Sequence, residues 1–264
     1  MGVLLIFFGT RTRVLWEIGG ILLFSRSITQ LPLARYDIDE IPTGKVLMKA
    51  KSLLLASASP ARRTTLVNAG IPPIIAVADL DEDILLEQAQ SDLTRLTVTE
   101  RAKRSVELLA SAKAHHVFHS LNELGLERSP AVIVGCDSML EMNGVIVGKP
   151  HTEQVARERL RSMSGNPGTL HTGHCVIDTA TGQAVTGVSS TVVHIGELSE
   201  EEIDAYIGTG EPLHVAGSFT IDGFGGPFIE RIEGDHHGVV GISLPLLRHM
   251  LAQLGHSIVE FWER

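Results

Sequence analysis

From Lys51 onward, short apolar runs typical of buried strands alternate with segments typical of helices, and this alternation constrains the fold most. Strands are predicted over 52–56, 131–136, 145–147, 173–178, 184–195 and 228–232. Helices are predicted over 60–69, 99–124 and 152–163, after the capping box at 199–202, and from 245 to 254. Because the order is not strictly strand–helix–strand, we expect an α/β domain with a mixed sheet.

Composition narrows the function classes. The 264 residues are 44% hydrophobic and 20% charged, which is enough apolar surface for a sizeable core. A net charge of −9 argues against a broad nucleic-acid-binding face, although a small basic pocket for a phosphorylated ligand remains compatible. Two cysteines, Cys136 and Cys175, build neither a disulfide scaffold nor a structural zinc site. We therefore expect a cytoplasmic protein without a nucleic-acid partner.

Residues 1–49 differ in character from the rest of the chain. The apolar runs 3–8 and 18–24 are too short to cross a membrane, and no charge precedes the first run as in a signal peptide. We expect no membrane partner and treat this region as an N-terminal extension outside the fold. It is expected to be disordered or to reflect a misassigned start, with Met48 as the true one. A functional anchor is the alternative.

The segment 57–63 is the first candidate site. Ser59 and Pro60 predict a helix N-terminus directly after a buried strand, where free N–H groups favour an anion. Ser57 lies at that junction, and Arg62 and Arg63 add bidentate phosphate donors. An ordinary capped helix with solvated arginines is the alternative.

Three further residues indicate chemistry. Lys113 lies four residues from both Leu109 and Val117, on an apolar helix stripe where a lysine needs an anion or must extend to solvent. Asp137 follows the predicted strand 131–136 and suits a general base or metal ligand, or merely caps a loop. Lys149 lies in a tight loop that resembles a Walker A motif but is one residue short.

Six motifs in order resemble the Maf family of nucleoside triphosphate pyrophosphatases. They are S-A-S-P-x-R-R at 57–63, D-E at 81–82, L-A-x-x-K-A at 109–114, G-C-D-S at 135–138, G-K-P at 148–150 and A-G-S-F-x-x-D-G-F-G-G at 216–226. The likeness covers about residues 51–256. It implies a single two-lobed domain over 50–264, with a mixed, twisted sheet similar to that of inosine triphosphate pyrophosphatases and the active cleft between the lobes.

The resemblance also implies an activity. Family members hydrolyse the bond between the α and β phosphates of a nucleoside triphosphate with a divalent metal, Mg²⁺ or Mn²⁺. Carried over by position, Asp137 would be the proton acceptor and, with Glu82, a metal ligand. The substrate-binding residues would be Ser57, Arg62, Arg63, Lys113, Lys149 and Asp222. A homodimer is the family expectation.

Two positions depart from the branch that acts on dTTP and UTP. Ala61 stands where that branch has its first arginine, and Asp222 stands where it has a glutamine. The S-P-x-R-R spacing is closer to the branch acting on 7-methyl-GTP, and an unselective enzyme is a further alternative. Outside hydrolysis, a non-catalytic nucleotide-binding regulator of septum formation and a nucleotidyltransferase are the rival functions.

Overall fold

The computed structural model describes residues 3–8, 11–18, 21–24, 50–126, 130–213 and 215–263. The chain divides into two units, Met1–Met48 and Lys49–Arg264. In the first unit, β1 (Val3–Phe8), β2 (Arg11–Ile18) and β3 (Ile21–Phe24) form an antiparallel sheet. The prediction that residues 1–49 form an extension stays a prediction, and Met48 lies outside the described residues.

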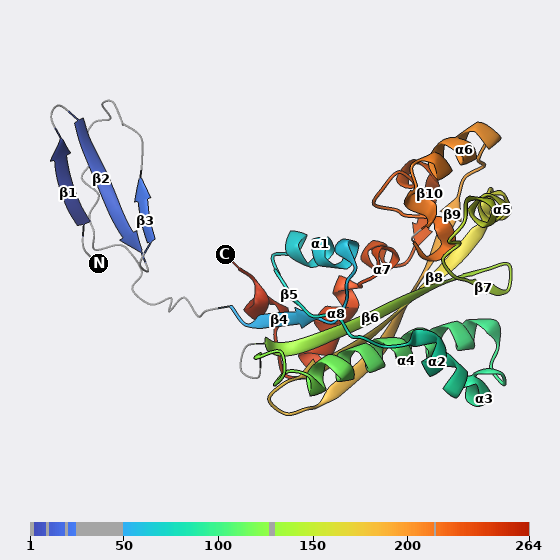
Figure 1. The fold of residues 1–264 in the computed structure, drawn as a ribbon, viewed down its shortest axis with the longest axis horizontal. Helices are drawn as coiled ribbons and strands as arrows, with labels where there is room; N and C mark the ends of the chain where they lie inside the picture. Colours follow the sequence, from blue (N-terminus) through green and yellow to red (C-terminus); the bar gives the residue numbers. More distant parts are fainter. Residues whose placement is uncertain are drawn as a thin grey trace. The chain divides into compact units, whose positions relative to one another are not determined.

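The second unit is built around a seven-stranded mixed sheet (Figure 1). Its strands are β4 (Ser52–Leu55), β5 (Ile74–Ile75), β6 (Pro130–Met142), β7 (Val145–Val147), β8 (Pro167–Asp178), β9 (Ala184–Ile195) and β10 (Ile229–Glu233). The order is β10-β9-β8-β6-β4-β5, and β7 pairs with the far end of β6. The β4–β5 and β4–β6 pairs are parallel, whereas the other pairs are antiparallel. The predicted mixed α/β class is confirmed.

Helices cover both faces of this sheet. They are α1 (Pro60–Asn68), α2 (Glu82–Gln88), α3 (Gln90–Leu93), α4 (Val98–His119), α5 (Glu153–Met163), α6 (Glu200–Gly208), α7 (His236–Val240) and α8 (Leu244–Gln253). Figure 1 shows β6 and β8 running the length of the unit, with α1 and α8 towards one end and α5 and α6 at the other. Within the described residues, no helix combines the length and hydrophobicity that crossing a membrane requires.

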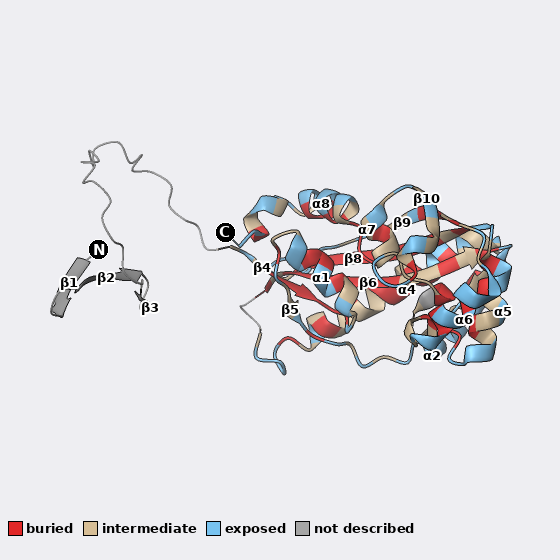
Figure 2. Cartoon of the chain, turned by 90° about the horizontal axis from the view of Figure 1, so that it is seen from above, coloured by how far each residue is buried: buried red, intermediate tan, exposed pale blue. Residues whose placement is uncertain are grey.

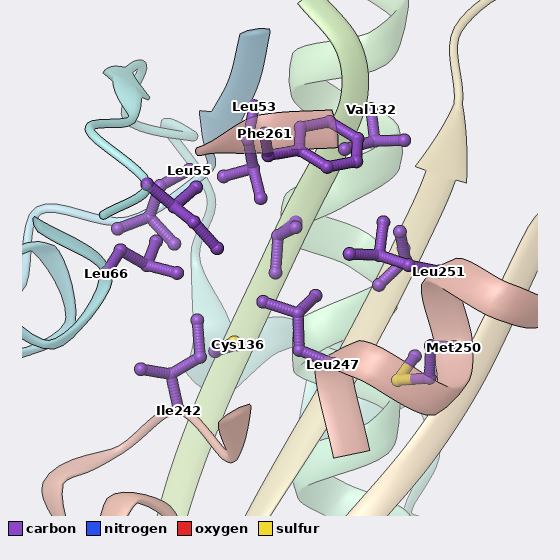
Figure 3. Packing of buried hydrophobic residues seen from close by; sticks show 13 residues of the cluster. Leu53, Leu55, Leu66, Val132, Cys136, Ile242, Leu247, Met250, Leu251 and Phe261 are labelled. Atoms are coloured by element: carbon purple, nitrogen blue, oxygen red, sulfur yellow. The ribbon is translucent and has the colours of Figure 1, made fainter. Parts of the chain in front are cut away.

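Successive side chains of the central strands enter two separate cores, as strand alternation requires. Leu53 and Leu55 belong to the cluster that α8 also enters, and Figure 3 shows Leu55 beside Leu66 of α1. Leu54 instead packs with Ile133 beneath α4. Figure 2 shows the buried strands enclosed by helices whose outer faces are exposed. Both faces of the central strands are therefore packed, and each Å² of apolar surface that they bury stabilises the fold by about 25 cal/mol.

Helix α4 approaches the sheet unusually closely at two glycines. A Cβ atom at Gly173 would lie 2.2 Å from the Val106 carbonyl oxygen, and one at Gly135 would lie 2.2 Å from that of Ala110. Neither position has room for a side chain. The glycines therefore let α4 lie directly on β6 and β8, which brings Lys113 beside the sheet.

Most predicted elements are confirmed within a few residues, but three differ in ways that bear on the site. The strand predicted over 173–178 already begins at Pro167 as β8. Asp137 does not follow a strand that ends at 136, because β6 continues to Met142 through antiparallel pairing with β8. The predicted helix 99–124 ends at His119. Glu82, predicted as a metal ligand, lies in the first turn of α2, which Asp81 caps.

Candidate functional site

Lys113 joins two carboxylates from different elements. Its Nζ lies 2.6 Å from Oδ1 of Asp137 on β6 and 2.7 Å from Oε1 of Glu82 on α2. The side chains of Lys113 and Asp137 are only 14% and 12% exposed, whereas that of Glu82 is 47% exposed. Among the described residues, Oδ2 of Asp137 has no hydrogen-bond partner. The lysine thus has the anionic partners that its place on the apolar stripe requires, and one oxygen of Asp137 stays available.

Arg62 is buried and uses its guanidinium within the protein. Its Nε donates to the carbonyl of Gly241, and one terminal nitrogen donates to the carbonyl of Cys136 and to Oγ of Ser57. The other terminal nitrogen donates to Oγ of Ser138. Four of five N–H groups are therefore engaged, and they fix the residues on either side of Asp137.

The N-terminus of α1 forms as the sequence predicts. The Ser59 hydroxyl accepts from the backbone N–H of Arg62, and Pro60 occupies the first turn. Oγ of Ser57 accepts from the Ser59 N–H at 3.2 Å and from Arg62 at 3.1 Å, which leaves its own proton free to donate. Residues 57–62 at this helix start line one cavity together with Asp137, so the positive end of the α1 dipole lies beside that cavity.

One cavity of about 1000 Å³ brings these groups together. Seven of the eight predicted site residues line it: Ser57, Arg62, Glu82, Lys113, Asp137, Lys149 and Asp222. Arg63 is exposed and does not line the cavity, so its expected role in binding gains no support from position. Lys149 and Asp222 are exposed at the rim, and Lys149 has no ion pair or hydrogen bond among the described residues.

The cavity has two chemically different ends. One carries Ser57, Glu82, Lys113 and Asp137, while the other, further along β6 where Leu140 pairs with Leu170, is lined by side chains of a separate apolar cluster, including Leu170, Val193 and Ile195. Phe219 packs against that cluster, and it also lines the cavity. Such a volume, with a polar and an apolar end, suits a ligand of nucleotide size.

Sequence reasoning assigned no role to several polar lining residues, of which three lie among the charged groups or carry special backbone geometry. Ser138 bonds to Arg62 and to Thr172, and its place beside Asp137 is the only signal that marks it. His151 has a positive φ of 60°, and Asp83 adds a further carboxylate beside Glu82. Cys136, although next to Asp137, is inert because burial raises the pKa of its thiol to about 12.

The donor set at Lys113 bears on a divalent metal. No cluster of three or more His, Cys, Asp or Glu side chains suited to a metal occurs in the described part of the chain. Mg²⁺, however, is commonly held by one or two carboxylates together with phosphate oxygens of the substrate. Glu82 and Asp137 supply two hard oxygen donors that already converge on the ammonium group of Lys113. These residues therefore fit a metal ion that enters with a triphosphate.

Comparisons with known proteins agree with one another. Residues 52–254 match the sequence model of the family described as Maf-like protein. Nucleoside triphosphate pyrophosphatase of Saccharopolyspora erythraea is 49% identical over 213 residues, covering 79% of this chain and 96% of the relative. Proteins of the same name from Salinispora tropica and Nocardia farcinica are 47% and 46% identical, each over 80% of this chain and over 88% and 96% of the relative.

Proposed function

Because the chain belongs to the Maf-like protein family, we propose that it is a hydrolase that converts nucleoside triphosphates to nucleoside monophosphates and pyrophosphate. The observation that carries the proposal is the cavity that joins Asp137 and Lys113 at one end to an apolar lining at the other. A triphosphate at the charged end places its nucleobase against the apolar end.

The residues at the charged end have different roles in binding the phosphate chain and in positioning the groups around Asp137. Lys149 and the N–H groups at the start of α1 bind the phosphate chain, and the Ser57 hydroxyl donates to a phosphate oxygen. Lys113 neutralises part of the negative charge that the triphosphate brings to Glu82 and Asp137. Arg62 keeps Ser57 and Ser138 in place around Asp137, so its main role is positioning.

Asp137 acts as the general base. Its free Oδ2 takes a proton from a water whose oxygen forms the new bond to the α phosphorus, while the bond to the α–β bridging oxygen breaks and pyrophosphate leaves. A positioned base contributes roughly 10²–10⁴-fold in rate. A divalent cation held by Glu82 and Asp137 would stabilise the charge that builds on the phosphate oxygens.

Product analysis tests this function. The intact chain is incubated with the common triphosphates, modified pyrimidine triphosphates and 7-methyl-GTP, each with Mg²⁺ or Mn²⁺. We expect a monophosphate and pyrophosphate, and the best substrate identifies the preferred nucleobase. Asp137→Asn should retain nucleotide binding but lose about 10²–10⁴-fold in rate. Asp92→Asn, an exposed position outside the cavity lining, is the matched control.

The rival functions predict different results. Binding without any product, in the intact chain, would favour a regulatory nucleotide-binding protein. Pyrophosphate that forms only when an acceptor is added would favour a nucleotidyltransferase. Near-normal rates in Asp137→Asn would show that Asp137 is not the general base, although the chain would still be a hydrolase.

A further inference from the structure

The segment 219–226 reaches the cavity without belonging to a strand, and only its last residue begins a helical turn, η4 (Gly226–Phe228). Four consecutive residues of this loop, 219–222, line the cavity. They include Phe219, which packs in the apolar cluster, and Asp222 at the rim. Because regular backbone pairing does not fix this loop, other contacts must hold the shape that it presents to a ligand.

The carboxylate of Glu211 provides those contacts. Glu211 begins η2 (Glu211–Leu213), and its Oε1 accepts from the hydroxyls of Tyr206 and Thr220 and from the N–H of Gly225. Its Oε2 accepts from the N–H of Phe224 at 3.1 Å. Three of these four donors belong to loop 219–226. A carboxylate has about four acceptor sites, so Glu211 is close to fully used by the loop and its support.

The glycines of the loop match this arrangement. A Cβ atom at Gly223 would lie 2.2 Å from Oε2 of Glu211, and one at Gly225 would lie 2.8 Å from the Tyr206 hydroxyl. The backbone therefore wraps around the carboxylate at a distance that only glycine permits. Tyr206, which donates to this carboxylate, also packs ring against ring with Phe219 and Phe228, with centroids 5.5 to 6.3 Å apart.

The charge state of Glu211 suits this role. Burial alone would raise its pKa, but the hydrogen bonds from Thr220, Phe224, Tyr206 and Gly225 outweigh it and lower the pKa. Burial, together with the bond to Glu211, raises the pKa of Tyr206, which therefore stays a protonated donor. Glu211 is thus an ionised acceptor at neutral pH, and hydrogen bonds to ionised groups are the stronger kind.

We propose that Glu211 is a positioning residue that sets nucleotide selectivity by holding loop 219–226 in the shape that faces the nucleobase. The proposal rests on the hydrolase function proposed above, since it assigns the apolar end of the cavity to the base. Glu211 is absent from the described cavity lining and so acts through the loop. The phosphate-binding residues and Asp137 lie on other elements, which separates base recognition from the chemical step.

The test compares Glu211→Ala and Glu211→Gln with the matched control Glu201→Gln, an exposed residue of α6. Steady-state kinetics over the nucleotide panel measure selectivity. Cleavage by chymotrypsin after Phe224, a residue that is 67% exposed, measures the order of the loop without reference to activity. Thermal unfolding of each variant is recorded alongside.

For Glu211→Ala we expect KM for the best nucleotide to rise about tenfold while kcat falls less than about threefold, because the lost contacts are mainly binding contacts. The ratio of kcat/KM between nucleotides should fall towards one, and cleavage after Phe224 should become about tenfold faster. Glu211→Gln should give selectivity and cleavage rates between those of Glu211→Ala and the intact chain, since its amide oxygen can accept from the three donors that now bond to Oε1. Glu201→Gln should match the intact chain.

Two results would overturn the proposal: unchanged selectivity together with unchanged cleavage, or equal loss of kcat/KM for every nucleotide in step with thermal unfolding. If Glu211→Ala does not fold, Glu211→Gln gives the same comparison. If the intact chain hydrolyses no nucleotide, the proposed function fails, and the selectivity proposal fails with it. The cleavage assay would then show separately whether Glu211 orders the loop.

Discussion

Lys113 on α4 and Asp137 on β6 form an ion pair of 2.6 Å in which both side chains are largely buried. The pair joins a helix to the central strand of the sheet, and Glu82 adds a second carboxylate from α2. One cation therefore faces two anions before any ligand binds, so the cluster of three side chains stays net negative. Removing that cation leaves a buried carboxylate without its partner, which is the costly half of breaking a buried pair.

Lys113→Met should lower the free energy of unfolding by about 2 kcal/mol, below the 3–5 kcal/mol of a fully buried pair because the site is partly solvated. Urea denaturation measures this change. The double variant Lys113→Met/Asp137→Asn should recover part of the loss, since the unpaired charge is then gone. Lys103→Met, an exposed position on the same helix, is the control. Additive effects in the double variant would contradict the coupling.

Arg62 and Arg63 are adjacent, yet the structure predicts opposite responses to substitution. Arg62→Lys loses the planar fork that reaches Gly241, Cys136, Ser57 and Ser138, so it should cost about 2–4 kcal/mol of stability and most activity. Arg63→Lys, exposed and outside the cavity lining, should change both by little. Denaturation and kcat/KM for both variants check this, and a larger kinetic loss in Arg63→Lys would restore its expected substrate contact.

The difference between these arginines shows where sequence reasoning reaches its limit. The Ser59 cap and the orientation of Lys113 were predictable, because local spacing along one helix determines both. The partners of Arg62 were not, since the Gly241 carbonyl is 179 residues away and a backbone carbonyl has no sequence signature.

Two further features depended on long-range structure. The length of β6 follows from its pairing with β8, which an apolar run ending at 136 does not reveal. Helix α2 contains no buried residue, so its sequence has no apolar stripe from which a helix could be predicted. Its Glu82 was named only through the family resemblance, and the structure then brings it within 2.7 Å of Lys113.

Gly173→Ala should prevent normal packing of α4 on β8. The added methyl group would lie 2.2 Å from a backbone oxygen of α4, which cannot move without shifting the helix that carries Lys113. We expect a loss of about 3 kcal/mol or more, at the upper end for overpacking. Gly208→Ala is the matched control, because nothing lies within 4 Å of a Cβ atom there. Equal unfolding midpoints for the two variants would contradict the close approach.

His174 should make stability depend on pH. Its side chain is buried on β8, its Nδ1 faces the Thr172 carbonyl, and its Nε2 accepts from the N–H of Ser243 at 2.8 Å. Burial, with the nearby charge of Arg62, lowers its pKa from 6.5 to about 4. The unfolded chain therefore binds a proton below about pH 6.5 that the folded chain binds only near pH 4, so stability falls as pH drops through this window.

Urea denaturation between pH 7.5 and 4.5 measures the effect against His174→Gln, whose amide oxygen can still accept from Ser243. The intact chain should lose about 2–3 kcal/mol more than the variant across this range, because a shift of one pKa unit corresponds to about 1.4 kcal/mol. Other titrating groups are common to both proteins and cancel in the comparison. His249→Gln, at an exposed position on α8, should follow the intact chain. Parallel pH profiles for His174→Gln and the intact chain would show that His174 is not the group responsible.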